Sequence, residues 1–270
     1  MILWIGSYPK SGNTWVRALL SSYLYANGGF DNFDVLKNIL NWDRSKFNSF
    51  LSLQDCININ NKTLLLKTHS AHADSFVNPR NTQAIIHIVR DPRNVITSLA
   101  NHYSITNEEA YNFLTQHDKV ISEAEKDGKL KGITTPIGSW GQHYGIWKKV
   151  TFAPFLMVKY EDLVKDTPKE FRRILNFVNK QLLDQQKEKR EIDEKKFLKT
   201  LENCTFEKLK QMEKDQVFEE APPISPAHEE IKHRTTFFHL GPKNNCLISS
   251  DLEKRIKTIF ADEMKELNYV

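Results

Sequence analysis

Four short apolar runs, none broken by alternating polar residues, most constrain the fold of this chain. They are Ile2–Ile5, Thr63–Leu66, Ala84–Val89 and Phe155–Val158. Such a run is typical of a strand with both faces buried, as in a parallel sheet. Helix-like patterns lie between and after the runs, at about 13–26, 93–103, 108–126, 138–150, 168–180, 193–214 and 251–267. This alternation predicts an α/β fold with a doubly wound parallel sheet, which binds ligands at the carboxyl ends of its strands.

The composition bears on domain organisation and on partners. No Gly/Ser/Pro-rich linker divides the 270 residues, so we expect one domain over 1–270. The net charge is only +4, which argues against a nucleic-acid-binding protein and favours a local basic site. The oligomeric state is left open.

Cysteine use and hydropathy bear on location. Cys56, Cys204 and Cys246 are odd in number and widely spaced, which favours free thiols over a disulfide framework or a zinc cluster. No apolar stretch approaches the roughly 20 residues that span a bilayer. The apolar N-terminal run stops at Gly6 and has no basic leader. We therefore expect no signal peptide, no membrane span and a cytoplasmic protein.

The segment Ser7–Trp15 directly follows the first apolar run and opens the first helix-like stretch. It reads Ser-Tyr-Pro-Lys-Ser-Gly-Asn-Thr-Trp. A strand, a tight basic turn and a helix N-terminus bring unpaired backbone N–H groups and the helix dipole to one place. The segment therefore predicts a binding site for a phosphate or sulfate ester. An ordinary strand-to-helix turn is the alternative.

The segment differs from a nucleoside triphosphate loop, whose G-x-x-x-x-G-K-[ST] pattern places a lysine directly after the second glycine. Here five residues separate Gly6 from Gly12, Asn13 takes the place of that lysine, and the cation of the loop is Lys10. A nucleotide kinase is therefore the weaker interpretation.

Cations also follow the other predicted strands. These strands end in Lys67-Thr68-His69, Arg90-Asp91-Pro92-Arg93 and Lys159-Tyr160-Glu161-Asp162. Asp91 and Pro92 are placed to cap and begin a helix, which fixes Arg90 at the edge of the sheet. Ser98 follows about two turns into that helix, where its hydroxyl could reach the same anion as Arg90.

Several motifs, in order, resemble one known family. They are Tyr-Pro-Lys-Ser-Gly-Asn-Thr-Trp, Lys-Thr-His after an apolar strand, Val-Arg-Asp-Pro-Arg-Asn-Val-x-x-Ser, Gly-Ser-Trp-x-x-His-x-x-x-Trp at 138–147, and Lys-Tyr-Glu-Asp-Leu. The chain thus resembles the cytosolic-type sulfotransferases, P-loop-like enzymes that use 3′-phosphoadenosine-5′-phosphosulfate (PAPS). The resemblance runs from residue 6 to about residue 180 and implies a sulfuryl transfer that leaves 3′-phosphoadenosine-5′-phosphate (PAP).

The resemblance implies which residues hold PAPS. The 5′-phosphosulfate would lie on the loop residues Lys10, Ser11, Gly12, Asn13, Thr14 and Trp15. The 3′-phosphate would be held by Arg90 and Ser98. The adenine would contact Tyr160 and Phe206, with Trp15 also near it, since an aromatic ring suits the flat face of a purine.

The resemblance also implies that His69 is the catalytic base and that Lys67 and Lys10 assist at the transferring group. The chemistry suits these residue types. Charge builds on the leaving phosphate oxygen, and positioned cations stabilise it. Because a sulfuryl group carries less negative charge than a phosphoryl group, lysines can replace a metal ion, and we expect no metal. Histidine titrates near neutral pH and suits a base.

The chain departs from the family near its C-terminus. In place of an Arg-Lys-Gly segment it has His239, Leu240 and Gly241, with no Gly-Asp-Trp after them. His239 and Gly241 are retained as candidate cofactor residues, and Lys232, Arg234 or Lys243 could compensate for the missing cations. The Pro-containing segment 217–230 before it is either a lid or a plain surface connection.

The acceptor is expected to be a small or sugar-like molecule with a hydroxyl or, as the weaker choice, an amine. Its pocket would be built from 30–53, 72–79 and 217–230. The first segment contains Phe30, Phe33, Trp42, Phe47 and Phe50, which either suit an apolar or sugar-like ligand or belong to a small additional core. His143 shares a helix face with Trp140 and Trp147; either it contacts the acceptor or the face packs in the core. A nucleotide-type phosphotransferase and a non-catalytic nucleotide-binding module are the alternative functions.

Overall fold

A computed structural model describes most of the chain. The described residues are 1–44, 63–71, 77, 79–124, 130–186, 191–216, 218, 220–221 and 236–270. In this part of the chain, no helix combines the length and the apolar character that a bilayer crossing requires. Cys204 and Cys246 are free thiols.

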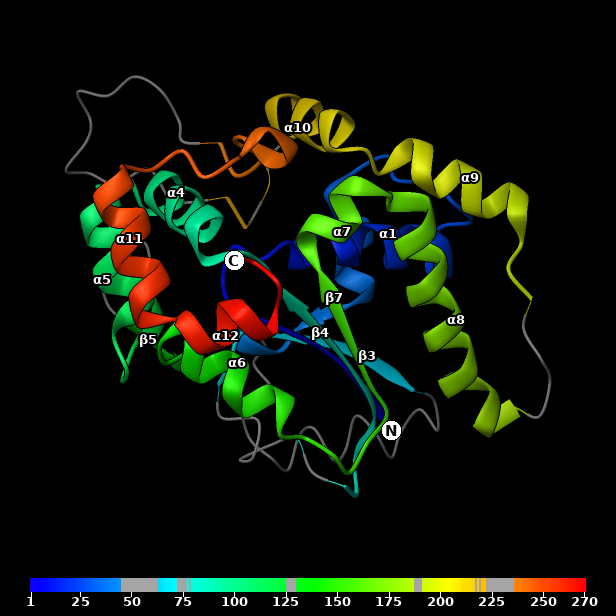
Figure 1. Ribbon diagram of the computed structural model, residues 1–270. Helices are drawn as coiled ribbons and strands as arrows, with labels where there is room; N and C mark the ends of the chain where they lie inside the picture. The colour runs from blue at the N-terminus through cyan, green and yellow to red at the C-terminus, as the bar shows by residue number, and fades with distance from the viewer. Residues whose placement is uncertain are drawn as a thin grey trace.

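A five-stranded parallel sheet forms the centre of the molecule (Figure 1). Its strands, in spatial order, are β2 (Leu40–Asn41), β3 (Leu64–Thr68), β1 (Ile2–Ser7), β4 (Thr82–Val89) and β7 (Phe155–Lys159). Every neighbouring pair runs parallel. The four strands predicted from the apolar runs are confirmed. One or two residues are added at the end of β1, β3 and β7 and at the start of β4, and β3 begins one residue later than predicted. The two-residue β2 was not predicted.

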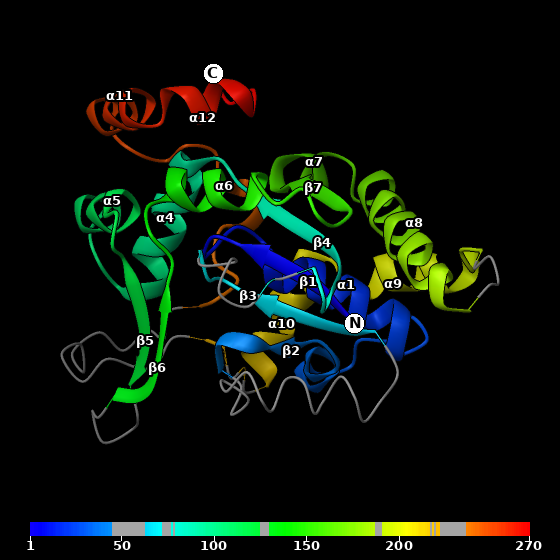
Figure 2. The same ribbon diagram turned by 90° about the horizontal axis from the view of Figure 1, so that it is seen from below.

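Helices cover both faces of this sheet, as the two views in Figures 1 and 2 show. One face carries α1 (Asn13–Tyr25), α7 (Tyr160–Lys165), α8 (Thr167–Gln186), α9 (Glu194–Asn203) and α10 (Phe206–Asp215). The other side carries α4 (Pro92–Tyr103), α5 (Asn107–Thr115), α6 (Trp140–Lys148), α11 (Ser250–Ile259) and α12 (Ala261–Glu266). Short 3₁₀ turns lie at η1 (Phe33–Asn38), η2 (Trp42–Arg44) and η4 (Gly241–Lys243). The α/β fold with helices on both faces is as predicted.

Strand β1 shows why its run is wholly apolar. Leu3 and Ile5 pack into one core cluster with α1 and α8. Ile2 and Trp4 point the other way and pack with Trp147 of α6. Successive side chains of a strand alternate between the faces of a sheet, so a strand covered on both faces must be apolar at every position. These four side chains are fully buried.

The helix predicted over 108–126 is wrong in its second half. Helix α5 ends at Thr115, and β5 (Val120–Ala124) pairs antiparallel with β6 (Leu130–Pro136). Val120 and Ile121 are β-branched and so favour a strand over a helix. Their partners across the hairpin are Pro136 and Thr135, which the helical periodicity could not reveal.

Two other predicted helical stretches are helical but divided. The stretch 193–214 divides at Cys204, where the Thr205 side chain accepts a hydrogen bond from the Lys208 backbone N–H and so caps α10. The stretch 251–267 divides at Phe260, between α11 and α12. The extended backbone of Thr205, with φ −65° and ψ 152°, is typical of an N-cap residue and interrupts the helical path between α9 and α10.

Candidate active site

The loop between β1 and α1 has the backbone geometry of an anion site. Lys10 and Gly12 both have positive φ angles, 64° and 97°. Gly12 stands at the N-cap position of α1 and offers no side-chain cap, so the first N–H groups of the helix are available to a ligand. A Cβ atom on Gly12 would come within 2.4 Å of the Tyr160 ring. Glycine is therefore required here both for its φ angle and for the close approach of Tyr160.

Polar atoms without partners gather around this loop. Within the described residues, Ser11 Oγ, Asn13 Oδ1 and Arg90 Nε are buried and make no hydrogen bond. Arg90 is 5% exposed; its Nη1 donates to the Lys10 carbonyl at 2.9 Å and its guanidinium lies 4.2 Å from the centre of the Tyr160 ring. Buried polar groups are normally satisfied, and the Ser11 hydroxyl and the Arg90 Nε–H are donors, so these two groups fit an anionic ligand at the loop.

Lys10 is held against an aromatic ring. Its Nζ lies 3.6 Å from the centre of the Phe237 ring and 3.3 Å from His102 Nδ1. Burial, and after it the positive charge of Arg90, lower the pKa of Lys10 to about 7. A lysine poised in this range gains its full charge when an anion binds beside it.

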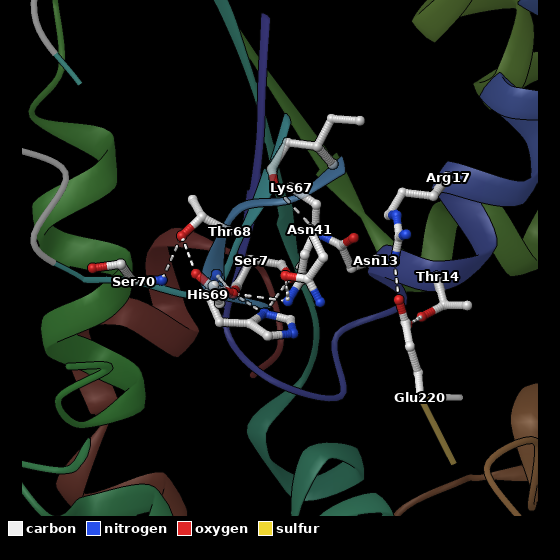
Figure 3. Close-up of polar contacts among 12 residues, drawn as sticks. Ser7, Asn13, Thr14, Arg17, Asn41, Lys67, Thr68, His69, Ser70 and Glu220 are labelled. Atoms are coloured by element: carbon white, nitrogen blue, oxygen red, sulfur yellow. Dashed lines mark hydrogen bonds and ion pairs between the residues drawn. The ribbon is translucent and has the colours of Figure 1, made fainter. Parts of the chain in front are cut away.

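His69 has a fixed tautomer. Its Nδ1 lies 2.8 Å from the Ser7 carbonyl oxygen, with Ser7 Oγ at 3.2 Å (Figure 3). Because a carbonyl can only accept, Nδ1 carries the proton and the lone pair is on Nε2. Burial, and next the charge of Lys67, lower the pKa of His69 to about 3. The imidazole is therefore neutral near pH 7 and able to accept a proton.

Lys67, on β3, is 4% exposed and already paired. Its Nζ donates to Asp43 Oδ2 at 2.8 Å and to Asn41 Oδ1 at 3.2 Å. Burial lowers the pKa of Lys67, and the Asp43 carboxylate opposes that shift. Neither Asp43 nor Asn41 was singled out from the sequence, because both lie on the short β2–η2 segment, which carries no strand or helix pattern.

A carboxylate also meets the first turn of α1, where Thr14 Oγ1 and Arg17 Nη1 donate to Glu220 at 3.2 and 2.6 Å (Figure 3). Arg17 is 2% exposed, and its Nη2 donates to the carbonyls of Leu36 and Ile39. Sequence reasoning missed Arg17 and Glu220, which are far apart in the chain. Their contact shows that this end of α1 accepts a negative charge.

Three aromatic residues are predicted to lie near the adenine: Trp15, Tyr160 and Phe206. The Trp15 and Tyr160 rings lie 6.0 Å apart, and Trp15 Nε1 donates to the Cys204 carbonyl at 2.8 Å. Gly241 has a φ of 53°, and a Cβ there would meet the Phe206 ring at 2.3 Å. Gly241 therefore lets the C-terminal segment pass close over Phe206.

Among the described residues, neither Ser98 nor the His239 side chain, the other predicted phosphate ligands, makes a hydrogen bond or ion pair with the loop. Ser98 lies in α4 and is half-buried. His239 is exposed, and its carbonyl accepts from Lys210 Nζ at 2.7 Å. Asn244 fixes the C-terminal segment to α4 through hydrogen bonds with Thr97 Oγ1 and the Asn94 carbonyl, both 2.8 Å.

Three aromatic side chains of helix α6 lie within hydrogen-bond distance of backbone carbonyls just after β3 and β4. Trp140 Nε1 donates to the Arg90 carbonyl, His143 Nε2 lies 3.2 Å from the His69 carbonyl, and Trp147 Nε1 donates to the Ser70 carbonyl. His143 is 1% exposed, and burial lowers its pKa to about 3. This placement agrees with the alternative that this helix face packs in the core. Contact of His143 with an acceptor stays a prediction.

Parts of the predicted acceptor pocket lie outside the described residues. They are 45–53, 72–76, 78, 217, 219 and 222–230, and with them Phe47 and Phe50. Lys232 and Arg234, named as compensating cations, lie outside as well. Of the described aromatic residues, Phe33 stacks on Phe218 with ring centres 4.2 Å apart. No group of three or more potential metal-ligating side chains occurs among the described residues.

Comparison with known proteins identifies relatives. The model of one family, described as the sulfotransferase domain, matches residues 2–267. A flavonol 3-sulfotransferase of Flaveria bidentis is 25% identical over 233 residues, which are 78% of this chain and 65% of that protein. The rat sulfotransferase 2A6 is 26% identical over 178 residues, 65% of this chain and 58% of that protein. The chain thus spans less than two thirds of the length of these relatives.

Solved structures share the fold. Mouse sulfotransferase SULT7A1 in complex with PAP matches with a TM-score of 0.63 at 16% identity, over 98% of this chain and 84% of that one. Retinol dehydratase in complex with retinol and PAP matches with a TM-score of 0.61 at 15% identity, over 98% of this chain and 81% of that one.

Proposed function

The chain belongs to the sulfotransferase-domain family, and we propose that it transfers a sulfuryl group from PAPS to a hydroxyl or amine group of a small molecule. The family match over residues 2–267 supports one domain for 1–270. The flavonol and retinol named for two relatives support a small organic acceptor.

The fit of the site to PAPS supports this proposal. The uncapped N-terminus of α1, the Ser11 hydroxyl and Lys10 offer donors to the 5′-phosphosulfate. Arg90 Nε is a buried donor for the 3′-phosphate, with Ser98 on the next helix. The faces of Trp15, Tyr160 and Phe206 suit adenine. PAPS supplies the activated sulfuryl group, and the protein's side chains provide the rest of the chemistry.

His69 is the proposed base. Its Nε2 would accept the proton of the acceptor group as the acceptor oxygen or nitrogen bonds to sulfur. The bond between that sulfur and the 5′-phosphate oxygen would break at the same time, and PAP would leave. The imidazolium that results is stabilised by its Nδ1–H bond to the Ser7 carbonyl. The proposal rests on one observation: His69 has a fixed tautomer and lies at the same edge of the sheet as Lys10.

The cations are proposed to stabilise the charge of the leaving group. Lys10 extends from the loop as a point charge, and an anion beside it raises its pKa from about 7. Lys67 donates two of its three N–H groups to Asn41 and Asp43, which leaves one N–H without a partner among the described residues. That group is proposed to donate to the transferring sulfuryl group.

The test is a transfer assay with PAPS labelled in the sulfuryl group and a panel of phenols, alcohols, sugars and amines. We expect label in an organic product, no transfer of the γ-phosphoryl group from labelled ATP, and full activity in EDTA. Transfer from ATP that stops in EDTA and returns with magnesium would instead establish a phosphotransferase.

A second candidate is a nucleotide-binding protein without transfer activity. The C-terminal segment favours it, because His239 and Leu240 stand where the family has cations. Calorimetry that finds tight PAP binding, together with no product from any member of the acceptor panel, would support this candidate.

A cytoplasmic location is also proposed. The free thiols of Cys204 and Cys246 support it. Fractionation of cells that express the chain would test it.

A further inference from the structure

The Asp43 carboxylate contacts both members of the predicted catalytic pair, Lys67 and His69. Asp43 Oδ2 accepts hydrogen bonds from Lys67 Nζ and from the His69 backbone N–H, both at 2.8 Å. Asp43 Oδ1 accepts from Thr68 Oγ1 at 2.7 Å. Three consecutive residues at the end of β3 therefore donate to a single side chain from η2.

The Asp43 carboxylate is buried and so is its cation. The side chains of Lys67 and Asp43 are 6% and 8% exposed. In such surroundings, an ion pair is strongly destabilised when one partner loses its charge. Burial alone would raise the pKa of Asp43, but the charge of Lys67 and the hydrogen bonds from Lys67 and Thr68 hold it below its ordinary value. Asp43 is thus ionised near pH 7.

The remaining contacts fix the direction of each group. Asn41 and Asp43 accept hydrogen bonds from two N–H groups of Lys67. Because the ammonium is tetrahedral, these two bonds fix the direction of its third N–H group. His69 is held by Asp43 at its backbone N–H, by Ser7 at Nδ1 and by His143 at its carbonyl. Its Nε2 has no hydrogen-bond partner among the residues that the structure describes, while the backbone and the other ring nitrogen are held in place.

From these contacts we propose that Asp43 is a positioning residue: it fixes the Lys67 ammonium and the His69 imidazole relative to each other without touching the transferred group. The role rests on the proposed sulfuryl transfer. Groups held in the productive geometry before the reaction avoid the cost of ordering them during it.

The pair also has an electrostatic consequence. The charged groups that act on Lys67 are Asp43, Glu220 and Arg17. The Asp43 carboxylate is, after burial, the largest influence on its pKa, and it acts to raise it. Without that charge, the pKa of Lys67 falls further, and the ammonium loses its proton at lower pH.

The test compares Asp43→Asn, Lys67→Met and the double variant with the parent. The assay is the exchange between PAP and 4-nitrophenyl sulfate, which releases 4-nitrophenolate when the sulfuryl group returns to PAP. We expect Asp43→Asn to lower kcat by about 10²-fold, the scale of a misplaced catalytic group, with the dissociation constant of PAP within about threefold of the parent's. The ratio of variant to parent kcat should fall as the pH rises, because Lys67 loses its proton at a lower pH in the variant than in the parent.

The double variant shows whether Asp43 acts through Lys67 or whether its substitution causes a general loss of structure. We expect the double variant to be about as active as Lys67→Met alone, with a ratio that no longer depends on pH. The matched control is Asp34→Asn, which neutralises an exposed carboxylate paired with Lys37 in η1 and should leave kcat unchanged.

The outcomes are distinct. Absence of exchange in the parent, despite PAP binding, would contradict the proposed sulfuryl transfer. If the parent is active, three results would each overturn the role of Asp43: an unchanged kcat in Asp43→Asn, independent effects of the two substitutions, or a variant that has lost PAP binding and thermal stability.

Discussion

Lys10 should make PAP binding depend on pH in a range where most lysines do not. Its pKa is about 7 in the free protein, chiefly through burial. A bound 5′-phosphate beside the Nζ raises that pKa, so that binding takes up a proton above pH 7. The affinity is therefore full below the free-state pKa and declines as the pH rises through it.

The magnitude follows from the free-state pKa. If the bound lysine stays charged, the dissociation constant grows as one plus ten to the power of pH minus 7. Between pH 7 and pH 8.5 this is about a 16-fold loss of affinity, or about 1.6 kcal/mol. Over the same range the phosphates of PAP are almost fully ionised, so they contribute little to the change.

Isothermal titration calorimetry with PAP measures this dependence. Titrations in two buffers of different ionisation enthalpy report the proton uptake, which should approach one per PAP at pH 8.5. Lys10→Met is the matched control, since it keeps the packing on the Phe237 ring and removes the charge. An affinity that stays constant from pH 7 to 8.5, or a slope that persists in Lys10→Met, would refute this reasoning.

Three further predictions address the cofactor site, the buried histidines and metal independence. Arg90→Ala should weaken PAP binding by about 1.5–3 kcal/mol, the scale of a hydrogen bond to a charged group; binding as tight as the parent's would show that Arg90 does not hold the 3′-phosphate. Acid should destabilise the fold, because His69 and His143 have pKa values of about 3 and that of His87 is far below its ordinary value, mainly through burial. The unfolded chain binds protons near pH 6.5 and the folded one does not, so stability falls below that pH, by about 2.5 kcal/mol for His69 and His143 together between pH 7 and 5.5. Urea unfolding at both pH values measures this loss, to which His87 adds, so His87→Leu should make it smaller; an equal loss in both proteins would contradict the assignment. Overnight dialysis against EDTA should leave the transfer rate unchanged, and a rate restored only by magnesium would contradict the lysine-based mechanism.

The sequence reveals those parts of the site that follow from local patterns. An apolar run predicts a buried strand, and residues directly after such runs must lie at one edge of a parallel sheet. Lys10, His69 and Arg90 were found this way. The helix cap at Asp91 is confirmed, because its side chain accepts from the Arg93 backbone N–H and Pro92 begins α4. Local chemistry decides these features, so a single sequence suffices.

Contacts between distant segments were beyond that reasoning. Asp43 lies 24 residues from Lys67 and Glu220 lies 203 residues from Arg17. Neither carboxylate stands in a motif or on a periodic face, and only the fold brings each to its cation. The β5–β6 hairpin was missed for the same reason, since a strand in this position depends on its partner rather than on its own periodicity.

The acceptor-proton role of His69 is the central claim, and the kinetics of His69→Ala test it most directly. A base acts in the transition state, so PAP affinity should stay within about threefold of the parent's while kcat falls by roughly 10²–10⁴. With a pKa of about 3, His69 should give the parent no loss of rate from its own protonation between pH 8 and pH 5. A His69→Ala protein that is folded, binds PAP and keeps the kcat of the parent would contradict the account.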